Sequence, residues 1–238
     1  MSDDLWDLEA LAAARGLGDW QFAQAAPYAR GTVAEVGAGI GTFSDRLLAA
    51  GVERLLLVEP EPACVEHLRA RFGADPRVSI ADETLPHAPA LAGLAGACDL
   101  VLCQNVLEHI ADDGAALAAM GAALRPEGVV VVLVPAHPRL FGALDRAYCH
   151  ERRYTRERLT RLAAETGLDV VSLVSFNALG IAGWWVKTRF SPQPRLDPAS
   201  LRWYERLLRV WRPVEDRIRP RLRFGLSLVL VARPRAGG

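Results

Sequence analysis

Short apolar runs alternate with helical segments along the first two thirds of this chain, and this alternation limits the available folds more than any other feature. The runs are rich in Val, Ile and Leu and nearly continuous, as strands buried on both faces of a sheet are. They lie at Val33–Val36, Leu55–Val58, Val78–Ile80, Leu100–Cys103 and Val129–Val134. Because parallel strands need right-handed crossovers with helices on both faces, these units predict an open, doubly wound α/β sheet.

Segments with apolar residues at helical spacing separate these runs, at 44–50, 62–72 and 112–124. Pro62 is suited to the first turn of its helix, and Asp112 is placed to cap the third segment. After Pro135 a further helix is expected from Thr155, its N-cap, and Asp169–Phe176 predicts a sixth strand.

A long interruption, Asn177–Arg223, separates this sixth strand from the last apolar run, Phe224–Ala232. It is too long for a plain connection, which predicts a lid or binding element built as a helical insertion. From Lys187 to the end the chain has 13 basic residues against 4 acidic ones, although its net charge is zero. The interruption also contains four tryptophans: Trp184, Trp185, Trp203 and Trp211.

Composition and charge exclude several classes of protein. A content of 51% hydrophobic and 24% charged residues is that of a globular chain. Zero net charge argues against binding to nucleic acid through a bulk positive field. Four cysteines without a CxxC pair indicate neither a disulfide framework nor a metal site. The acidic start is unlike a signal peptide and no run is long enough to span a membrane, so we expect a reduced, cytoplasmic protein.

Glycines cluster at the turn that leaves the first predicted strand, Ala34–Thr42. Side chains there would block both the reversal of the chain and the approach of a ligand to the backbone, although such turns also carry glycines for steric reasons alone. Glu59 ends the next strand, where an acid can accept hydrogen bonds from both ribose hydroxyls. A dinucleotide turn would need glycine where Thr42 stands, so the pattern predicts a nucleoside site that is not for a nicotinamide cofactor.

The spacing Gly37-x-Gly39-x-Gly41 resembles motif I of the class I S-adenosylmethionine-dependent methyltransferases. Three further stretches resemble the later motifs of that family: Ile80–Asp82, Asp99–Ile110 and Leu124–Gly128. The resemblance covers about residues 30–176, the expected cofactor-binding core, and points to the bacterial, small-molecule, type 11-like members. It implies a single methyltransferase domain over 1–238, with a mostly parallel, seven-stranded Rossmann-like sheet, a helical lid at 177–223 and a reversed final strand at 224–232.

The resemblance also implies that the chain binds S-adenosylmethionine and releases S-adenosylhomocysteine. The residues expected to contact this cofactor are Glu35, Gly37, Ala38, Gly39, Gly41, Glu59, Pro60, Asp82, Gln104, Asn105, Val106 and His109. Among them Glu59 would bind the ribose and Asp82 would face the adenine, a part that the neighbouring Glu83 could also take. Pairing with a nearby arginine or capping of a helix is the structural alternative for Glu35 and Glu59.

Methyl transfer from a sulfonium needs no catalytic side chain where nucleophile and methyl group are held in line. A hydroxyl or acidic carbon as acceptor would need a base, for which histidine is the first candidate. His150 lies in a dense run of ionisable and aromatic residues, 145–155, and is preferred to His137, with Tyr154 as a further catalytic candidate. Solvated charge is the alternative for this run. The expected substrate contacts are Tyr148, Arg153, Trp184 and Trp185.

Arginines interleaved with aromatic residues within 187–223 suit an anionic or aromatic acceptor. The sequence therefore predicts a methyltransferase for a small molecule, in bacterial secondary metabolism and with no nucleic-acid partner. Two alternatives stay open for the same segment. It could lie on a membrane surface, in an enzyme or binding module for a lipid-linked or quinone-type substrate, or pack its tryptophans on the sheet. A homodimer would also be consistent with exposed tryptophans.

Overall fold

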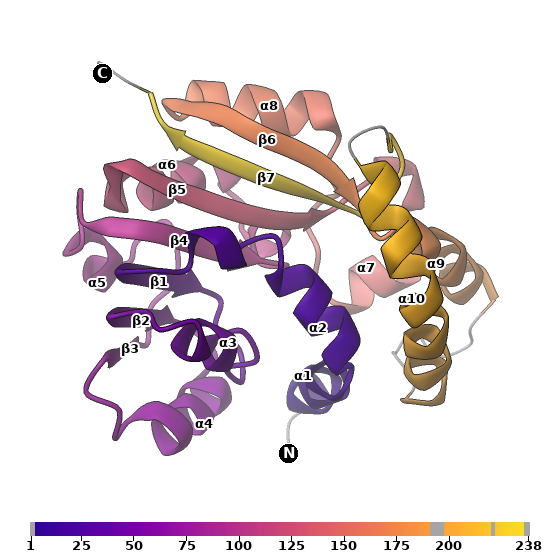
Figure 1. The fold of residues 1–238 in the computed structure, drawn as a ribbon, viewed down its shortest axis with the longest axis horizontal. Coiled ribbons are helices and arrows are strands. Elements are labelled where there is room, and N and C mark those ends of the chain that lie inside the picture. The colour runs from indigo at the N-terminus through magenta and orange to yellow at the C-terminus, as the bar shows by residue number, and fades with distance from the viewer. Residues whose placement is uncertain (1–2, 191–197, 220–221, 236–238) are drawn as a thin grey trace.

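The structure is a computed structural model that describes residues 3–190, 198–219 and 222–235 (Figure 1). A seven-stranded sheet forms its centre, in the order β3-β2-β1-β4-β5-β7-β6. The strands are β1 (Thr32–Val36), β2 (Arg54–Val58), β3 (Val78–Ala81), β4 (Cys98–Gln104), β5 (Leu124–Pro135), β6 (Leu168–Phe176) and β7 (Ser227–Pro234). β7 runs antiparallel to both of its neighbours, and the other pairs are parallel. The predicted mostly parallel, doubly wound sheet with a reversed last strand is confirmed.

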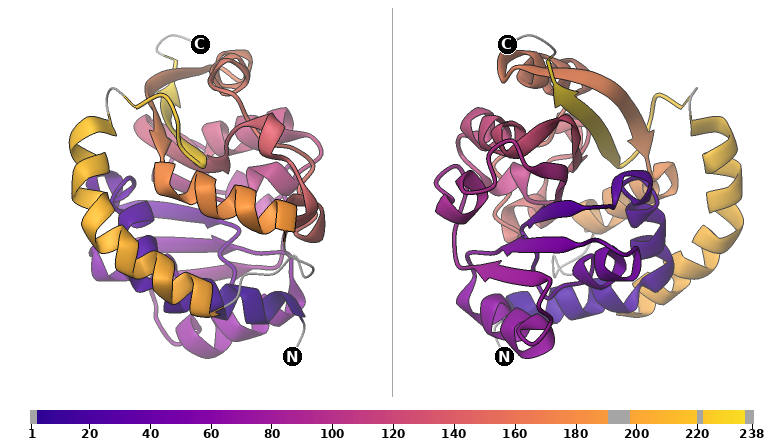
Figure 2. Two further views of the ribbon diagram at one scale, coloured as in Figure 1. Left: turned by 90° about the vertical axis from the view of Figure 1, so that its right-hand side faces the viewer. Right: turned by 60° about the vertical axis from the view of Figure 1, so that its left-hand side comes forward.

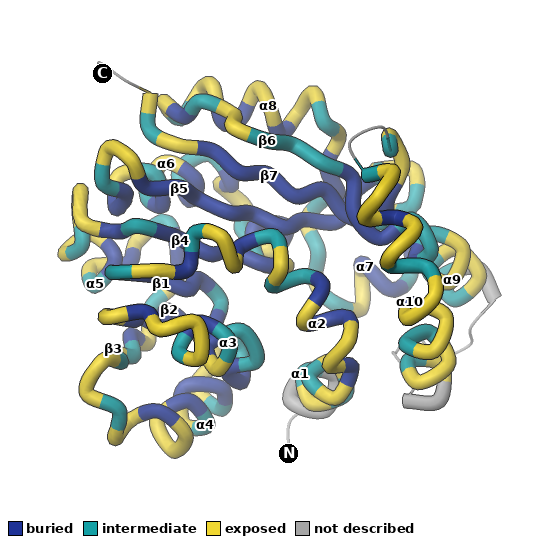
Figure 3. Tube along the Cα trace, in the orientation of Figure 1, coloured by how far each residue is buried: buried dark blue, intermediate teal, exposed yellow. Residues whose placement is uncertain are grey.

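The sheet is buried on both faces, which explains why its strands are continuous apolar runs. Successive residues of a strand point to opposite faces. Ala34 and Val101 therefore belong to one apolar core, whereas their neighbours Val33 and Leu100 belong to the other. Figure 3 shows β5 and β7 buried along most of their length.

Helices cover both faces of the sheet. Their bounds are α1 (Asp3–Ala13), α2 (Arg15–Phe22), α3 (Ser44–Ala49), α4 (Pro62–Phe72), α5 (Pro89–Ala92), α6 (Asp113–Ala123), α7 (Ala143–Ala147), α8 (Arg156–Glu165), α9 (Ala178–Phe190) and α10 (Pro198–Ile218), with short 3-10 turns η1 (Ala26–Tyr28), η2 (Leu107–His109) and η3 (Pro138–Leu140). The two predicted N-caps are confirmed: Asp112 accepts a hydrogen bond from the Ala115 nitrogen at 2.8 Å, and Thr155 accepts one from the Arg158 nitrogen at 3.2 Å. α5, α6 and α8 pack on one face, and α2, α3 and α4 on the other.

The segment between β6 and β7 forms two helices, α9 and α10, at the edge of the sheet where β6 ends (Figures 1 and 2). Glu215 of α10 is fully buried and accepts hydrogen bonds from the main-chain nitrogens of Asn177 and Ala178, at 2.6 and 2.9 Å. α10 also contacts α2, where the buried Trp20 donates its ring nitrogen to Asp216 at 2.8 Å. These polar contacts hold α10 across the end of β6. No helix of the described residues is long and apolar enough to cross a bilayer.

Candidate active site

The turn after β1 has the backbone conformation that its glycines permit. Gly37, Gly39 and Gly41 have φ angles of 71°, 54° and 82°, in the region where L side chains are strained. A Cβ atom on Gly37 would lie 2.1 Å from Cγ2 of Val106, and one on Gly41 would lie 2.4 Å from the ring of Phe72. At Gly39 the nearest atom is 3.7 Å away, on Leu8 of α1. Two of the glycines are therefore needed for packing, whereas a Cβ atom on Gly39 would make only an ordinary van der Waals contact with Leu8.

Glu59, at the end of β2, lies directly against this turn. Its carboxylate accepts hydrogen bonds from the main-chain nitrogens of Gly39 at 2.8 Å and Glu61 at 3.0 Å. The side chain is buried, and this desolvation raises its pKa although both hydrogen bonds lower it. No arginine forms an ion pair with Glu59 in the described part of the chain, although such a pair was the structural alternative for this residue.

Glu35 lies one strand away and is buried with a single hydrogen-bond donor, the hydroxyl of Ser44, at 2.6 Å. Desolvation raises its pKa to about 8. The contact joins the end of β1 to the first residue of α3, so Glu35 supports the turn from within the protein. Its contact with the cofactor stays a prediction.

The carboxyl ends of β3 and β4 provide polar groups along the same edge of the sheet. Asp82 is exposed, whereas the carboxylate of Glu83 accepts a hydrogen bond from the Ala90 nitrogen at 2.9 Å in the first turn of α5. Of these two candidates, Asp82 is the one that remains available to a ligand. Gln104 ends β4 with its Oε1 atom buried and without a hydrogen-bond partner among the described residues, and the exposed Asn105 follows with a φ of 54°. Of the other expected contacts, Ala38 is buried in the turn and Pro60 is exposed.

A second group of side chains forms around Asp145 of α7, which is fully buried. Its carboxylate accepts hydrogen bonds from Nδ1 of His150 at 2.9 Å, Nε of Arg153 at 2.7 Å and the nitrogen of Gly142 at 2.9 Å. Burial by itself raises the pKa of Asp145, but the hydrogen bonds from His150 and Arg153 bring it below its usual value. The hydrogen bond at Nδ1 leaves Nε2 of His150 as the nitrogen that can take a proton or bind a ligand.

Arg153 connects this group to α9. Its side chain is 1% exposed, donates to the carbonyl oxygen of Ala136 at 3.0 Å and lies 4.6 Å from the ring centre of Trp184. Its donors are therefore engaged within the protein, and the arrangement favours a role in positioning Asp145 over the expected contact with substrate. Tyr148 lies closer to the candidate site, with its ring centre 6.2 Å from that of His150, whereas Trp185 is 52% exposed on α9.

Glu108 and His109 approach His150 from η2, directly after β4. The rings of His109 and His150 are nearly perpendicular, at 84°, with their centres 4.8 Å apart. Desolvation, with the charge of His150, lowers the pKa of His109 to about 4. Glu108 is fully buried, and no other described residue donates a hydrogen bond to its carboxylate oxygens. Desolvation raises its pKa to about 8, although its own main-chain nitrogen lowers it. One potential ligand atom from each of the three residues lies within 4.8 Å of the others.

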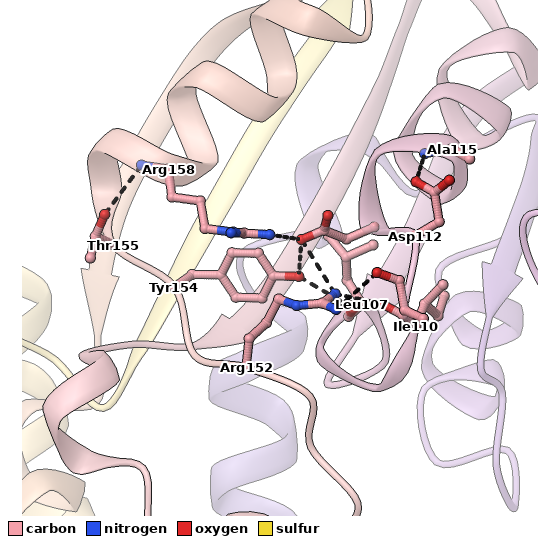
Figure 4. A network of polar contacts seen from close by, with 10 residues as sticks. Leu107, Ile110, Asp112, Ala115, Arg152, Tyr154, Thr155 and Arg158 are labelled. Carbon is pink, nitrogen blue, oxygen red and sulfur yellow. Dashed lines mark hydrogen bonds and ion pairs between the residues drawn. The ribbon is translucent and has the colours of Figure 1, made fainter.

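Two of the predicted catalytic residues lie apart from this group. Tyr154 is fully buried, and its hydroxyl donates to Asp113 at 2.9 Å and to the carbonyl oxygen of Leu107 at 3.2 Å, in a network that Arg158 joins (Figure 4). Burial raises its pKa well above the usual value. Because this hydroxyl is used to fasten the chain to α6 and η2, the geometry does not favour a catalytic role for it. His137 instead stacks on Phe224, with ring centres 6.3 Å apart.

Sequence reasoning did not single out three residues of the site: Glu108, Asp145 and Leu8. Glu108 could have been identified as an acidic residue next to His109 within an apolar stretch. Asp145 could have been identified from its position five residues before His150. Nothing in the sequence indicated that Leu8 would lie over the glycine turn. The prediction that no metal site exists also relied on spacing along the chain, which does not reveal that η2 and the loop after α7 meet.

Known proteins share both the sequence pattern and the fold. A family model described as a methyltransferase domain matches residues 15–173. A Mycolicibacterium smegmatis protein named "Probable S-adenosylmethionine-dependent methyltransferase/" is 29% identical over 153 residues, which span 63% of this chain and only 57% of that protein. The solved S-adenosylmethionine dependent methyltransferase from Mesorhizobium loti is 14% identical with a TM-score of 0.62, over 92% of this chain and 99% of that one. The 1,6-didemethyltoxoflavin-N1-methyltransferase from Burkholderia thailandensis, solved with S-adenosylhomocysteine, is 20% identical with a TM-score of 0.50, over 86% and 71%.

Proposed function

The chain belongs to the family of class I S-adenosylmethionine-dependent methyltransferases, and from this premise we propose that it methylates a small molecule whose reacting group lies beside His150. The first part of the proposal concerns the cofactor. The main chain of Gly37–Gly41 would lie against the amino acid part of S-adenosylmethionine, and Asp82 would face the adenine. S-adenosylmethionine supplies a methyl group that is already activated on sulfur, so that positioning accounts for much of the acceleration.

Three features of the described residues fit this cofactor. Gly39 has a φ of 54° and no close packing against its Cα, since an added Cβ atom would only touch Leu8 at 3.7 Å, so its main chain can be approached by a ligand. Glu59 is held at the same turn by two main-chain hydrogen bonds, and a carboxylate has further lone pairs to accept hydrogen bonds from ribose hydroxyls. Gln104 has a buried oxygen without a partner at the end of β4, and such a group favours a bound donor.

The observation that carries the proposal on the acceptor side is the hydrogen bond of 2.9 Å between His150 and Asp145. A buried carboxylate that orients a histidine through one ring nitrogen prepares the other for proton transfer. His150 would take the proton of an acceptor hydroxyl as the methyl group is transferred. Its side chain is only 10% exposed, and this confined setting suits a small molecule better than a polymer.

Two measurements test the proposal. We expect the purified protein to bind S-adenosylhomocysteine in calorimetry, and to transfer radiolabelled methyl groups from S-adenosylmethionine to members of a panel of hydroxylated aromatic acids. The absence of binding at millimolar S-adenosylhomocysteine would contradict the cofactor assignment. Binding without transfer to any member, but with transfer to a protein or nucleic acid, would contradict the substrate class alone.

A specific observation favours a second candidate, a methyltransferase or binding module that works at a membrane surface on a lipid-linked or quinone-type substrate. α10 exposes an apolar row at helical spacing: Trp203, Leu207, Val210, Val214 and Ile218. Exposed arginines follow one side of this row: Arg202, Arg206, Arg209 and Arg217. A helix with an apolar face and flanking arginines can lie in the interface of an anionic bilayer.

Figure 2 shows α10 along the outside of the molecule, where it contacts α2 and α9 through its other side. Flotation with vesicles that contain phosphatidylglycerol, compared with vesicles of phosphatidylcholine alone, tests this candidate. We expect binding to the anionic vesicles only. A protein that floats with neither kind of vesicle, and is dimeric by light scattering, would instead use this apolar row as a contact between two copies.

A further inference from the structure

Glu108, His109 and His150 bring one carboxylate and two imidazoles to one place from two separate parts of the chain, η2 and the loop after α7. One potential ligand atom from each lies within 4.8 Å of the others. Two histidines and one carboxylate are a frequent ligand set for divalent transition metals in proteins, with other coordination positions left for water or substrate. We infer that these three residues bind a divalent transition-metal ion beside the methyl-transfer site.

The environment of Glu108 is the observation that points most directly to a cation. Its side chain is fully buried, and neither carboxylate oxygen has a hydrogen-bond partner in the described residues. Buried carboxylates without partners are strongly disfavoured, and a cation bound to them removes this penalty. Arg153 acts on Glu108 through its charge, but its hydrogen bonds go to Asp145 and Ala136. The main-chain nitrogen of Glu108 itself also favours the ionised carboxylate, but no other residue of the described chain donates a hydrogen bond to it, and a metal ion would supply that partner.

The two histidines are arranged as metal ligands commonly are. Asp145 holds His150 through Nδ1, at 2.9 Å, and a carboxylate in this position fixes the ring orientation and makes Nε2 a better ligand. The rings of His109 and His150 meet nearly at right angles, so that their nitrogens can approach one point from different directions. Asp145 in turn accepts hydrogen bonds from Arg153 and from the nitrogen of Gly142, so the carboxylate that orients His150 is itself held in place.

The consequence for catalysis rests on the proposed function, whereas the cation site itself does not. A hydroxyl coordinated to a divalent cation loses its proton more readily than a free one. With a metal ion bound, the acceptor proton would leave to solvent and the oxygen would attack the methyl carbon with the electron pair that it keeps. The carbon–sulfur bond would break with its electron pair going to sulfur, which releases S-adenosylhomocysteine. His150 would then serve as a ligand instead of as the proton acceptor.

Binding of metal to the protein after treatment with a chelator tests the inference without any substrate. We expect one Co²⁺ ion to bind per chain with a visible absorption spectrum of bound cobalt, and Mn²⁺ to bind in calorimetry. Glu108→Gln keeps the shape of the side chain but removes its charge, and should weaken Co²⁺ binding about 100-fold. His109→Gln should weaken it to a similar degree. His87→Ala is the matched control, because it removes an exposed imidazole outside the cluster and should leave binding unchanged.

The outcomes separate this inference from the proposed function. No Co²⁺ binding at millimolar concentration, or equal binding in wild type and Glu108→Gln, overturns the metal site even where S-adenosylhomocysteine binds normally. The thermal unfolding of metal-free Glu108→Gln provides a check on folding. At pH 9, where the Glu108 carboxyl is ionised, we expect it to unfold at the same or a higher temperature than the metal-free wild type, since a buried charge is removed. A metal-free variant that unfolds earlier would show that the carboxylate already has a stabilising partner.

Discussion

The Glu59 carboxylate accepts a hydrogen bond of 2.8 Å from the main-chain nitrogen of Gly39, 20 residues earlier in the chain. This contact joins the ends of β1 and β2, which pair in parallel with Val36 opposite Val58. The carboxyl ends of adjacent parallel strands are where open α/β sheets bind their ligands. A ligand that lies against the turn therefore also lies next to the carboxylate, and this relationship leads to the first two predictions.

Gly39→Arg should abolish binding of S-adenosylhomocysteine in calorimetry, because the long side chain would extend past Leu8 into the position proposed for the cofactor. Arginine also strains a backbone at a φ of 54° by about 1–2 kcal/mol. Gly51→Arg is the matched control, since Gly51 has a φ of 87° and no atom within 4 Å of its added Cβ. Equal affinity in Gly39→Arg and wild type would refute the proposed position of the cofactor.

Glu59→Gln should weaken binding of S-adenosylhomocysteine by about 10–100-fold, because hydrogen bonds from hydroxyls to a charged carboxylate contribute about 1.5–3 kcal/mol. The amide oxygen can still accept the hydrogen bond from Gly39, whereas the amide nitrogen cannot accept the one from Glu61, which is lost. Glu61→Gln, at an exposed position two residues on, should bind with wild-type affinity. If both variants bind equally well, Glu59 supports the turn without contacting the ribose.

Glu35 should make the stability of the protein without ligand fall as the pH rises from about 4.5 to 8. Its pKa is raised by burial from 4.5 to about 8, so over this window the folded state holds a proton that the unfolded state has lost. Above pH 8 the buried carboxyl must ionise, and its unfavourable contribution is then complete. Glu35→Gln should lack this dependence. Chemical denaturation gives the free energy of unfolding of variant and wild type at pH 5 and at pH 8.5, and the difference between the two proteins should change by a few kcal/mol between these pH values. A constant difference would show that Glu35 is ionised throughout.

His150→Ala should lower methyl transfer by about 100-fold or more, the usual contribution of a group that assists proton transfer. Its affinity for S-adenosylhomocysteine should not change, because the hydrogen bonds of His150 go to Asp145 and not to the glycine turn. His87→Ala should retain full activity. Turnover in His150→Ala equal to that of the wild type would remove His150 from the reaction.

Val210→Glu should prevent flotation with anionic vesicles if α10 lies on a membrane. Val210 is 77% exposed at the centre of the apolar row, and a carboxylate there opposes both apolar burial and the negative surface. Val171→Glu places the same charge on β6, at a valine that is 49% exposed, and should float like the wild type. Loss of flotation in both variants would indicate a general effect of charge and not a contact through α10.

Much of the fold followed from features that neighbouring residues determine. The run Val33–Val36 and the glycines after it predicted the first strand and its turn, and Asp112 and Thr155 were identified as caps from their local sequence. These signals are local because strand burial, backbone conformation and capping depend on residues a few positions apart. Even the reversed last strand came from the family resemblance, since nothing within 224–232 indicates its direction.

The composition of the candidate site depended on contacts between distant residues. Tyr154 and His150 stand four positions apart in the same ionisable run, yet the Tyr154 hydroxyl is buried against α6 while His150 faces His109. Leu8 lies near Gly39 only because α1 folds back over the turn.

The sheet and the glycine turn could be predicted from local sequence, because periodic burial and backbone freedom are properties of short stretches of chain. The orientation of His150 by Asp145, and the burial of Glu108 without a hydrogen bond from another described residue, depend on tertiary contacts. The charge and reactivity of such groups depend on which side chains exclude water from them and which donors reach them. Those neighbours come from η2, α7 and the loop after α7, which the chain brings together only when it folds.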